Sequence, residues 1–192
     1  MMYTPIKRNF QVIEHEQPIK KVKHLRKMTQ QRLKNIALYY LKRFDSSVAN
    51  LRLVLQRRVN DYAYHVPDFV KRDAYDWIET ILSDFQRVGY LNDFRYAEMK
   101  VKSYVLAGKS LRYIQRKLKE KGIDENVTEQ LVAEQDFDPF DAAMKLARKR
   151  KIGPFNPSIT LRKERRNKEL AILVRAGFDY DVAVKVLDST DC

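Results

Sequence analysis

Apolar residues recur at intervals of three and four positions along most of the chain. This spacing places them on one face of an α-helix. An early example lies between residues 30 and 41 and consists of Leu33, Ile36, Ala37, Tyr40 and Leu41. Similar apolar helix faces recur along the chain, and the last of them includes Val182 and Val186. The pattern predicts nine short helices and no β-sheet.

Typical helix boundaries flank several of these segments. Ser46 or Ser47, and farther on Ser110, are suitable N-caps, because a serine oxygen accepts a hydrogen bond from an otherwise unpaired backbone N–H of the first turn. Asp138-Pro139 is a strong signal for the start of a helix. The backbone N–H of the first helical residue has no partner within the helix, so proline, which lacks this N–H, loses no hydrogen bond there. Residues 59–69, which include two tyrosines, a histidine and Pro67, are predicted to connect the second and third helices.

The chain contains an internal repeat. Gly122-Ile123-Asp124 returns as Gly177-Phe178-Asp179 at an offset of 55 residues, and Ser47 returns as Ser110 at an offset of 63. Each unit is then three short helices, which cannot bury an apolar face alone but can do so when stacked. We therefore expect an elongated, curved all-α body. It would comprise an arm (1–28) and three-helix modules at 29–91, 92–136 and 137–192.

The low glycine and proline content favours a helical fold, and the excess of basic residues indicates a polyanionic partner. Only 5 Gly and 6 Pro occur in 192 residues, too few for a turn-rich sheet fold. Lys and Arg number 38 against 25 Asp and Glu, a net charge of +13. Residues 1–60 alone hold 14 basic and 3 acidic side chains. Such an asymmetry favours binding to nucleic acid, where cations displace counterions from phosphates.

Features of the sequence also indicate where the protein works. The longest apolar run, Ile36 to Leu41, is six residues, whereas a membrane helix needs about 20. The first ten residues do not resemble a secretory signal. The one cysteine, Cys192, cannot form an internal disulfide, which fits a reducing compartment. We expect a monomeric cytoplasmic protein with no membrane contact.

Neither catalytic nor metal-binding patterns emerge. The three histidines lie apart from one another and from Cys192 at no metal-ligand spacing. Gly108-Lys109-Ser110 matches the end of a phosphate-binding P-loop, but the motif requires glycine where Ser103 stands. A helix stop, a connecting residue and an N-cap explain these three residues. We expect no enzyme activity, metal or cofactor.

The basic segments are the candidate binding residues. A cluster at the start of a helix opposes the helix dipole and so favours a nearby anion, whereas one at a helix end has a structural explanation too. The predicted contacts to nucleic acid or its protein complex are Lys20, Lys21, Lys23, Arg26, Lys27, Arg112, Arg116, Lys119, Arg148, Lys149, Arg162, Lys163, Arg165 and Arg166.

Residues 89–97 read GYLNDFRYA. This stretch resembles GYLDDxRFA of the RecX family of RecA recombinase regulators, with Asn92 in place of the usual Asp. Residues 108–124 resemble its second-module helix pair, residues 142–149 its AxxLARKK stretch, and residues 175–180 its closing RGFxYD. The similarity extends over about residues 33–188.

The resemblance implies three tandem three-helix modules that bind in the groove of a RecA–DNA filament. It also implies inhibition of filament growth, ATPase and strand exchange, with phosphate contacts to single- and double-stranded DNA. The alternative from charge alone is a free-standing helical DNA- or RNA-binding protein. The two differ in stoichiometry, because a filament modulator acts below the recombinase concentration and a competitor must cover the DNA.

Overall fold

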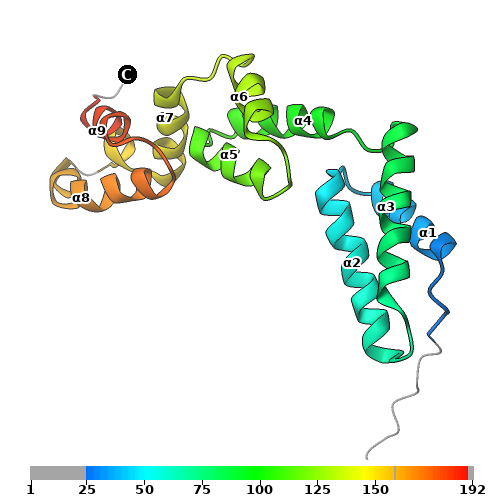
Figure 1. Cartoon of the computed structure of the whole chain (residues 1–192). Helices are drawn as coiled ribbons and strands as arrows, with labels where there is room; N and C mark the ends of the chain where they lie inside the picture. Colours follow the sequence, from blue (N-terminus) through cyan, green and yellow to red (C-terminus); the bar gives the residue numbers. More distant parts are fainter. Residues whose placement is uncertain (1–24, 158, 190–192) are drawn as a thin grey trace, which may run out of the picture.

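The structure is a computed structural model that describes residues 25–157 and 159–189, without the side chains of residues 159–163. In this part of the chain it contains nine α-helices, one short 3-10 helix and no strand. The helices follow one another in three groups along an elongated body that bends after the first group (Figure 1). The predicted all-α fold of tandem three-helix modules is confirmed. None of the described helices is long and apolar enough to cross a membrane.

The first module consists of α1 (Gln30–Leu41), α2 (Val48–His65) and α3 (Lys71–Arg87). Its core includes Leu33, Leu51 and Phe85, each at most 1% exposed. Met28, which the sequence placed in the arm, is buried in the same core.

The predicted connection over residues 59–69 is wrong at its start, because α2 continues to His65. Val59 and Tyr62 extend the apolar face of Leu51 and Leu55 by two further turns, and both are buried. The ring of Tyr62 meets Phe69 edge-on, with 4.9 Å between ring centres. This packing stabilises the extra helix length, so the aromatic cluster belongs to the core and not to a loop.

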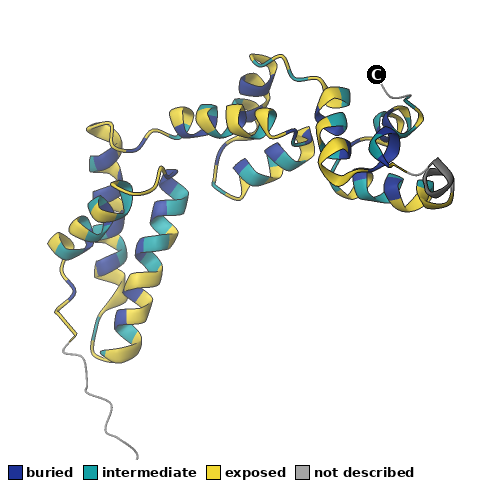
Figure 2. Ribbon diagram, turned by 180° about the vertical axis from the view of Figure 1, so that it is seen from behind, coloured by how far each residue is buried: buried dark blue, intermediate teal, exposed yellow. Residues whose placement is uncertain are grey.

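The other two modules each have a core of their own, as Figure 2 shows by the separate groups of buried residues. The second consists of α4 (Asp93–Leu106), α5 (Leu111–Lys119) and α6 (Glu125–Ala133). The third consists of α7 (Pro139–Arg150), the 3-10 helix η1 (Gly153–Phe155), α8 (Ile159–Arg175) and α9 (Tyr180–Asp188). Phe137 packs against both cores and so lies at the boundary between the two modules.

A buried carboxylate fixes the irregular segment of the third module. Glu169 of α8 is only 5% exposed. It accepts hydrogen bonds from the Gly153 backbone N–H (2.8 Å) and from Asn156 Nδ2 (3.0 Å). These bonds offset the cost of removing a carboxylate from water and hold η1 against α8.

The same serine contact joins successive modules at both junctions. Ser47 Oγ accepts the Asn50 N–H of its own helix (3.2 Å) and donates to the carbonyl of Lys121 in the second module (2.7 Å). Ser110 Oγ likewise accepts the Tyr113 N–H (3.2 Å) and donates to the carbonyl of Ala176 in the third (2.7 Å). Each serine is therefore both the N-cap of a helix and a link to the next module.

A glycine follows each of the two carbonyls that accept these bonds. Gly122 and Gly177 have φ of +73° and +95°, which glycine adopts without strain. A Cβ atom on Gly122 would lie 2.5 Å from Ala49 Cβ, and one on Gly177 would lie 2.6 Å from Ser110 Oγ. The junctions therefore require residues without side chains.

Replacing Gly122 by Ala is expected to destabilise the protein more than replacing Gly89 by Ala. Both positions have positive φ, which costs an alanine about 1–2 kcal/mol, but no atom lies within 4 Å of a Cβ on Gly89. The contact with Ala49 adds a further cost of roughly 1–3 kcal/mol for Gly122→Ala. Urea unfolding of both variants measures the difference, and equal losses would contradict the close junction.

Candidate nucleic-acid interface

Three of the five predicted contacts in the arm lie outside the described residues. They are Lys20, Lys21 and Lys23. Arg26 and Lys27 are exposed directly before α1. Their backbone carbonyls accept hydrogen bonds from the Arg32 guanidinium, so this end of the arm is attached to the first module while its side chains stay in solvent.

The second module presents its predicted cations along α5. Arg112, Arg116 and Lys119 are all exposed. Arg112 Nη2 lies 2.8 Å from Asp179 Oδ1 of the third module, so this ion pair spans the junction. The Lys119 ammonium is 4.0 Å from Glu125, the outer limit of an ion pair. Their neighbour Lys117 bonds Glu120 at 2.7 Å, and this hydrogen bond raises the pKa of Lys117.

The cations of the third module differ in how far they are already neutralised. The guanidinium carbon of Arg148 lies 5.0 Å from the ring centre of Phe155, and Lys149 is exposed beside it. On α8, Arg165 is exposed. Arg162 and Lys163 belong to the same helix, but their side chains are outside the described residues.

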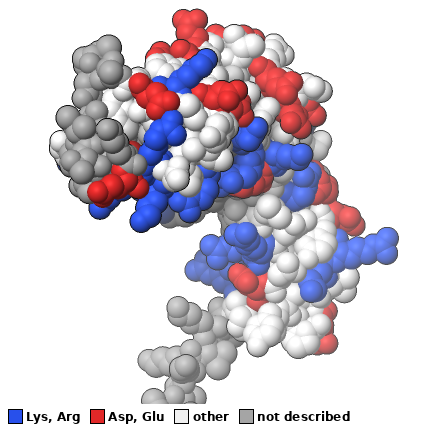
Figure 3. Space-filling model, turned by 90° about the vertical axis from the view of Figure 1, so that its left-hand side faces the viewer, with Lys and Arg blue, Asp and Glu red and all other residues white. Residues whose placement is uncertain are grey.

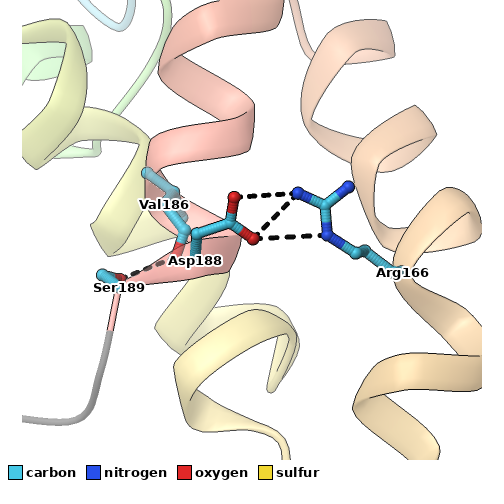
Figure 4. Close-up of polar contacts among 4 residues, drawn as sticks. All are labelled: Arg166, Val186, Asp188 and Ser189. Carbon is cyan, nitrogen blue, oxygen red and sulfur yellow. Dashed lines mark hydrogen bonds and ion pairs between the residues drawn. The ribbon is translucent and has the colours of Figure 1, made fainter.

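Arg166 is held by a carboxylate of the neighbouring helix α9 (Figure 4). Its Nη2 lies 2.8 and 2.9 Å from the two oxygens of Asp188, and its Nε lies 3.3 Å from Oδ1. The hydrogen bond to Asp188 is the main cause of the raised pKa of Arg166. The Arg166 guanidinium, which the sequence analysis assigned to phosphate binding, is therefore already bound to Asp188 within the protein.

A groove between the second and third modules brings together cations that sequence reasoning did not connect. Lys109, Arg116, Arg150 and Arg175 line this space of about 340 Å³ together with Tyr113. Only Arg116 had been predicted as a contact. Lys109 was interpreted as a connecting residue, and Arg150 and Arg175 stand in the last turn of a helix, where a cation is favourable for the helix dipole alone. The internal repeat was the signal in the sequence that could have indicated this groove. When one repeated module packs on the next, the helix ends that carry these cations come together.

The cations are not spread evenly over the surface. On the face shown in Figure 3, Lys and Arg gather along the lower edge of the upper part of the molecule, and Asp and Glu lie mainly above them. Phosphates lie along a line in a nucleic acid, so a band of charge can contact several of them at once. Among the described residues, no three His, Cys, Asp or Glu side chains gather in a potential metal site.

The fold and this surface define an all-helical protein of tandem three-helix modules with a basic face. A model of the second three-helix domain of RecX matches residues 92–131, the core of the second module. Regulatory protein RecX from Myxococcus xanthus (strain DK1622) is 39% identical over 170 residues, 87% of this chain and 90% of that protein. The chain belongs to the RecX family of regulatory proteins.

Other relatives and solved structures agree with this assignment. Regulatory protein RecX from Agrobacterium fabrum (strain C58) is 29% identical over 158 residues, 82% of each chain. The crystal structure of RecX from Lactobacillus salivarius has a TM-score of 0.56 at 24% identity and covers 83% of this chain and 96% of that one. At this identity the structural likeness supports the fold alone.

Replacing Asp188 by Asn is expected to strengthen binding to single-stranded DNA. The change frees the Arg166 guanidinium for a phosphate, and one added contact makes the log–log salt slope steeper by about 0.7. Asp84→Asn is the matched control, because it removes the same charge from an exposed arginine pair (Asp84–Arg87, 3.0 Å) in the first module. Salt-dependent fluorescence anisotropy measures both slopes. Identical slopes in the two variants would rule out a role for Arg166.

Proposed function

We propose that this protein binds the RecA recombinase filament on DNA and limits its growth, and with it ATPase activity and strand exchange. Membership of the RecX family supports this proposal most directly, because its relatives are regulatory proteins. In this proposal the protein acts as a cytoplasmic monomer, needs no cofactor and catalyses no reaction itself.

The series of modules gives a physical reason for filament binding. A filament offers equivalent sites at regular intervals, and three similar modules along one body offer similar surfaces in sequence. Once one module is bound, the others meet their sites at a high effective concentration. Linkage of this kind raises avidity by roughly 10²–10⁴-fold without stronger individual contacts.

The basic face supplies the second part of the proposed interaction. Cations near the DNA of a filament gain from counterion release and orient the body during its approach. Arg112, Arg116 and Lys119 of the second module and Arg148, Lys149 and Arg165 of the third are the proposed contacts. Phosphate contacts of this kind do not depend on sequence, so single- and double-stranded DNA both bind.

The ATPase activity of RecA on single-stranded DNA tests the proposal when titrated with this protein. Capping a growing end affects many protomers, so half-inhibition is expected below the concentration of RecA. A free-standing DNA-binding protein has to cover the DNA, and then inhibition would follow the concentration of DNA sites. That result, or no inhibition at all, would contradict the filament proposal.

Removing the third module is expected to weaken filament inhibition far more than binding to free DNA. A chain ending at Phe137 keeps the residue that packs on the second core and loses 12 basic and 8 acidic side chains. Its net charge falls by four, whereas the arm and the first module keep most of the positive charge. The concentration that halves RecA ATPase activity is compared with the affinity for single-stranded DNA.

A full-length variant with the same net charge separates charge from shape. It carries Gln in place of four exposed cations of the third module, namely Lys149, Arg165, Lys168 and Lys185. Inhibition by this variant should decline only as far as its DNA affinity does. Unfolding transitions confirm that both proteins fold. Equal loss of inhibition and DNA affinity in the truncated chain would favour the simple DNA-binding alternative.

A further inference from the structure

Four cations converge on the groove between the second and third modules. Lys109 comes from the connection between α4 and α5, Arg116 from α5, Arg150 from the last turn of α7 and Arg175 from the last turn of α8. No acidic residue is among the described residues that line the groove. Like charges brought together at a partly enclosed surface repel each other, so this arrangement carries an electrostatic cost that a bound anion removes.

Neutral groups help to position three of these cations. The Lys109 ammonium lies 4.9 Å from the ring centre of Tyr113, and the Arg116 guanidinium lies 5.7 Å from it. Arg175 Nε donates to the carbonyl of Ala171 at 3.0 Å. A tyrosine ring and a peptide carbonyl orient cationic groups without cancelling their charge.

The tyrosine that positions two of the cations is itself held in place. Its ring meets Tyr104 edge-on, with 5.5 Å between ring centres. Partial burial raises the pKa of Tyr104. The edge-on contact with Tyr104 therefore holds the Tyr113 ring that Lys109 and Arg116 both approach.

Many other cations on the molecule are paired with carboxylates. Arg52 bonds Glu79 at 2.7 and 2.8 Å, and Lys102 bonds Glu98 at 2.8 Å. Among the described residues, Arg116 is the one cation of the groove with a carboxylate within ion-pair distance. Glu120 lies 3.9 Å from its Nε, and that carboxylate bonds Lys117 more closely at 2.7 Å. The groove therefore gathers four cations in one place, whereas the pairs named above each carry a carboxylate that balances the cation.

We infer that this groove is a discrete phosphate-binding site that holds a phosphodiester of single-stranded DNA. Its volume of about 340 Å³ equals that of roughly ten water molecules, enough for a phosphodiester group with bound water. Three arginines and a lysine around one anion supply the forked and single donors that phosphate oxygens accept. The inference rests on the proposed function, because DNA within the filament is the source of the phosphodiester.

Both modules contribute to the site, which links DNA binding to the arrangement of the body. Lys109 and Arg116 belong to the second module, and Arg150 and Arg175 belong to the third. A phosphate between them bridges the two modules next to the Ser110 bond to Ala176. The docked junction therefore binds the anion more tightly than separated modules do, and the anion stabilises the docked junction in return.

Binding of oligothymidylate at increasing salt tests the site in an Arg150→Gln/Arg175→Gln double variant. Both side chains are exposed, so folding is expected to be retained. Loss of the one phosphate held in the groove makes the log–log salt slope shallower by about 0.7. The matched control is Lys71→Gln/Arg72→Gln, which removes two exposed cations at the start of α3 in the first module. Its slope should equal that of the unmodified protein.

A single variant and a second ligand complete the test. Lys109→Gln should make the slope shallower by at most about 0.7, and it tests the site even if the double variant fails to fold. Oligothymidylate should raise the unfolding temperature of the unmodified protein more than inorganic phosphate does at equal phosphate concentration. Equal slopes in the groove and control variants, or equal stabilisation by the two ligands, would overturn the assignment.

RecA ATPase inhibition by the same proteins separates this inference from the proposed function. If the unmodified protein inhibits RecA below its concentration while the groove variants keep the full salt slope, the filament proposal stands and the groove assignment is wrong. If the groove variants lose phosphate affinity but the unmodified protein fails to inhibit RecA, the groove binds DNA and the filament proposal is wrong.

Discussion

A single buried hydrogen bond at each junction determines how the modules follow one another. Ser47 and Ser110 are 0% and 2% exposed, and each donates its hydroxyl hydrogen to a carbonyl of the next module at 2.7 Å. The net stabilisation of such a bond is about 1 kcal/mol, but leaving its buried partner unsatisfied costs about 1–3 kcal/mol. A rotated or shifted module loses the bond, so the contact selects one arrangement among many.

The surrounding contacts are adapted to that bond and differ between the two junctions. At the first, the Val48 N–H donates to Asp93 Oδ1 at 2.8 Å, and the Lys121 ammonium donates to Asn50 Oδ1 at 2.7 Å. At the second junction, the Arg112–Asp179 ion pair joins the second module to the third. The shared serine and glycine set a common geometry, while the variable neighbours give the second junction its cationic groove. The proposed phosphate site thus lies at one of two junctions built on the same serine contact.

Local signals in the sequence were sufficient for the helices and their repeat. Ser47 and Ser110 were recognised as N-caps because capping depends on the next three residues alone. Their bonds to Lys121 and Ala176 were not predictable, because the partners lie 74 and 66 residues away and no local pattern reports them. The groove escaped notice for the same reason. Lys109, Arg150 and Arg175 each satisfied a local rule, and only the docking of two modules makes them neighbours.

Two further features could not be predicted from the sequence, namely the length of α2 and the pairing of Arg166 with Asp188. Tyr62 lies in a stretch whose aromatic residues and Pro67 resemble a connection, yet its packing on Phe69 extends the helix. Arg166 was grouped with other cations by composition, whereas the structure gives it a carboxylate partner 22 residues away. In both cases tertiary contacts decide between two locally acceptable readings.

In the proposed mode of binding, modules held in one arrangement engage successive parts of a RecA filament. Cryo-electron microscopy of RecA filaments on single-stranded DNA with this protein bound can show whether they do. We expect density along the filament groove in which one copy touches more than one RecA protomer through different modules, with the junction between the second and third modules facing DNA. A copy attached through one module alone, or density on bare DNA only, would contradict this mode of binding.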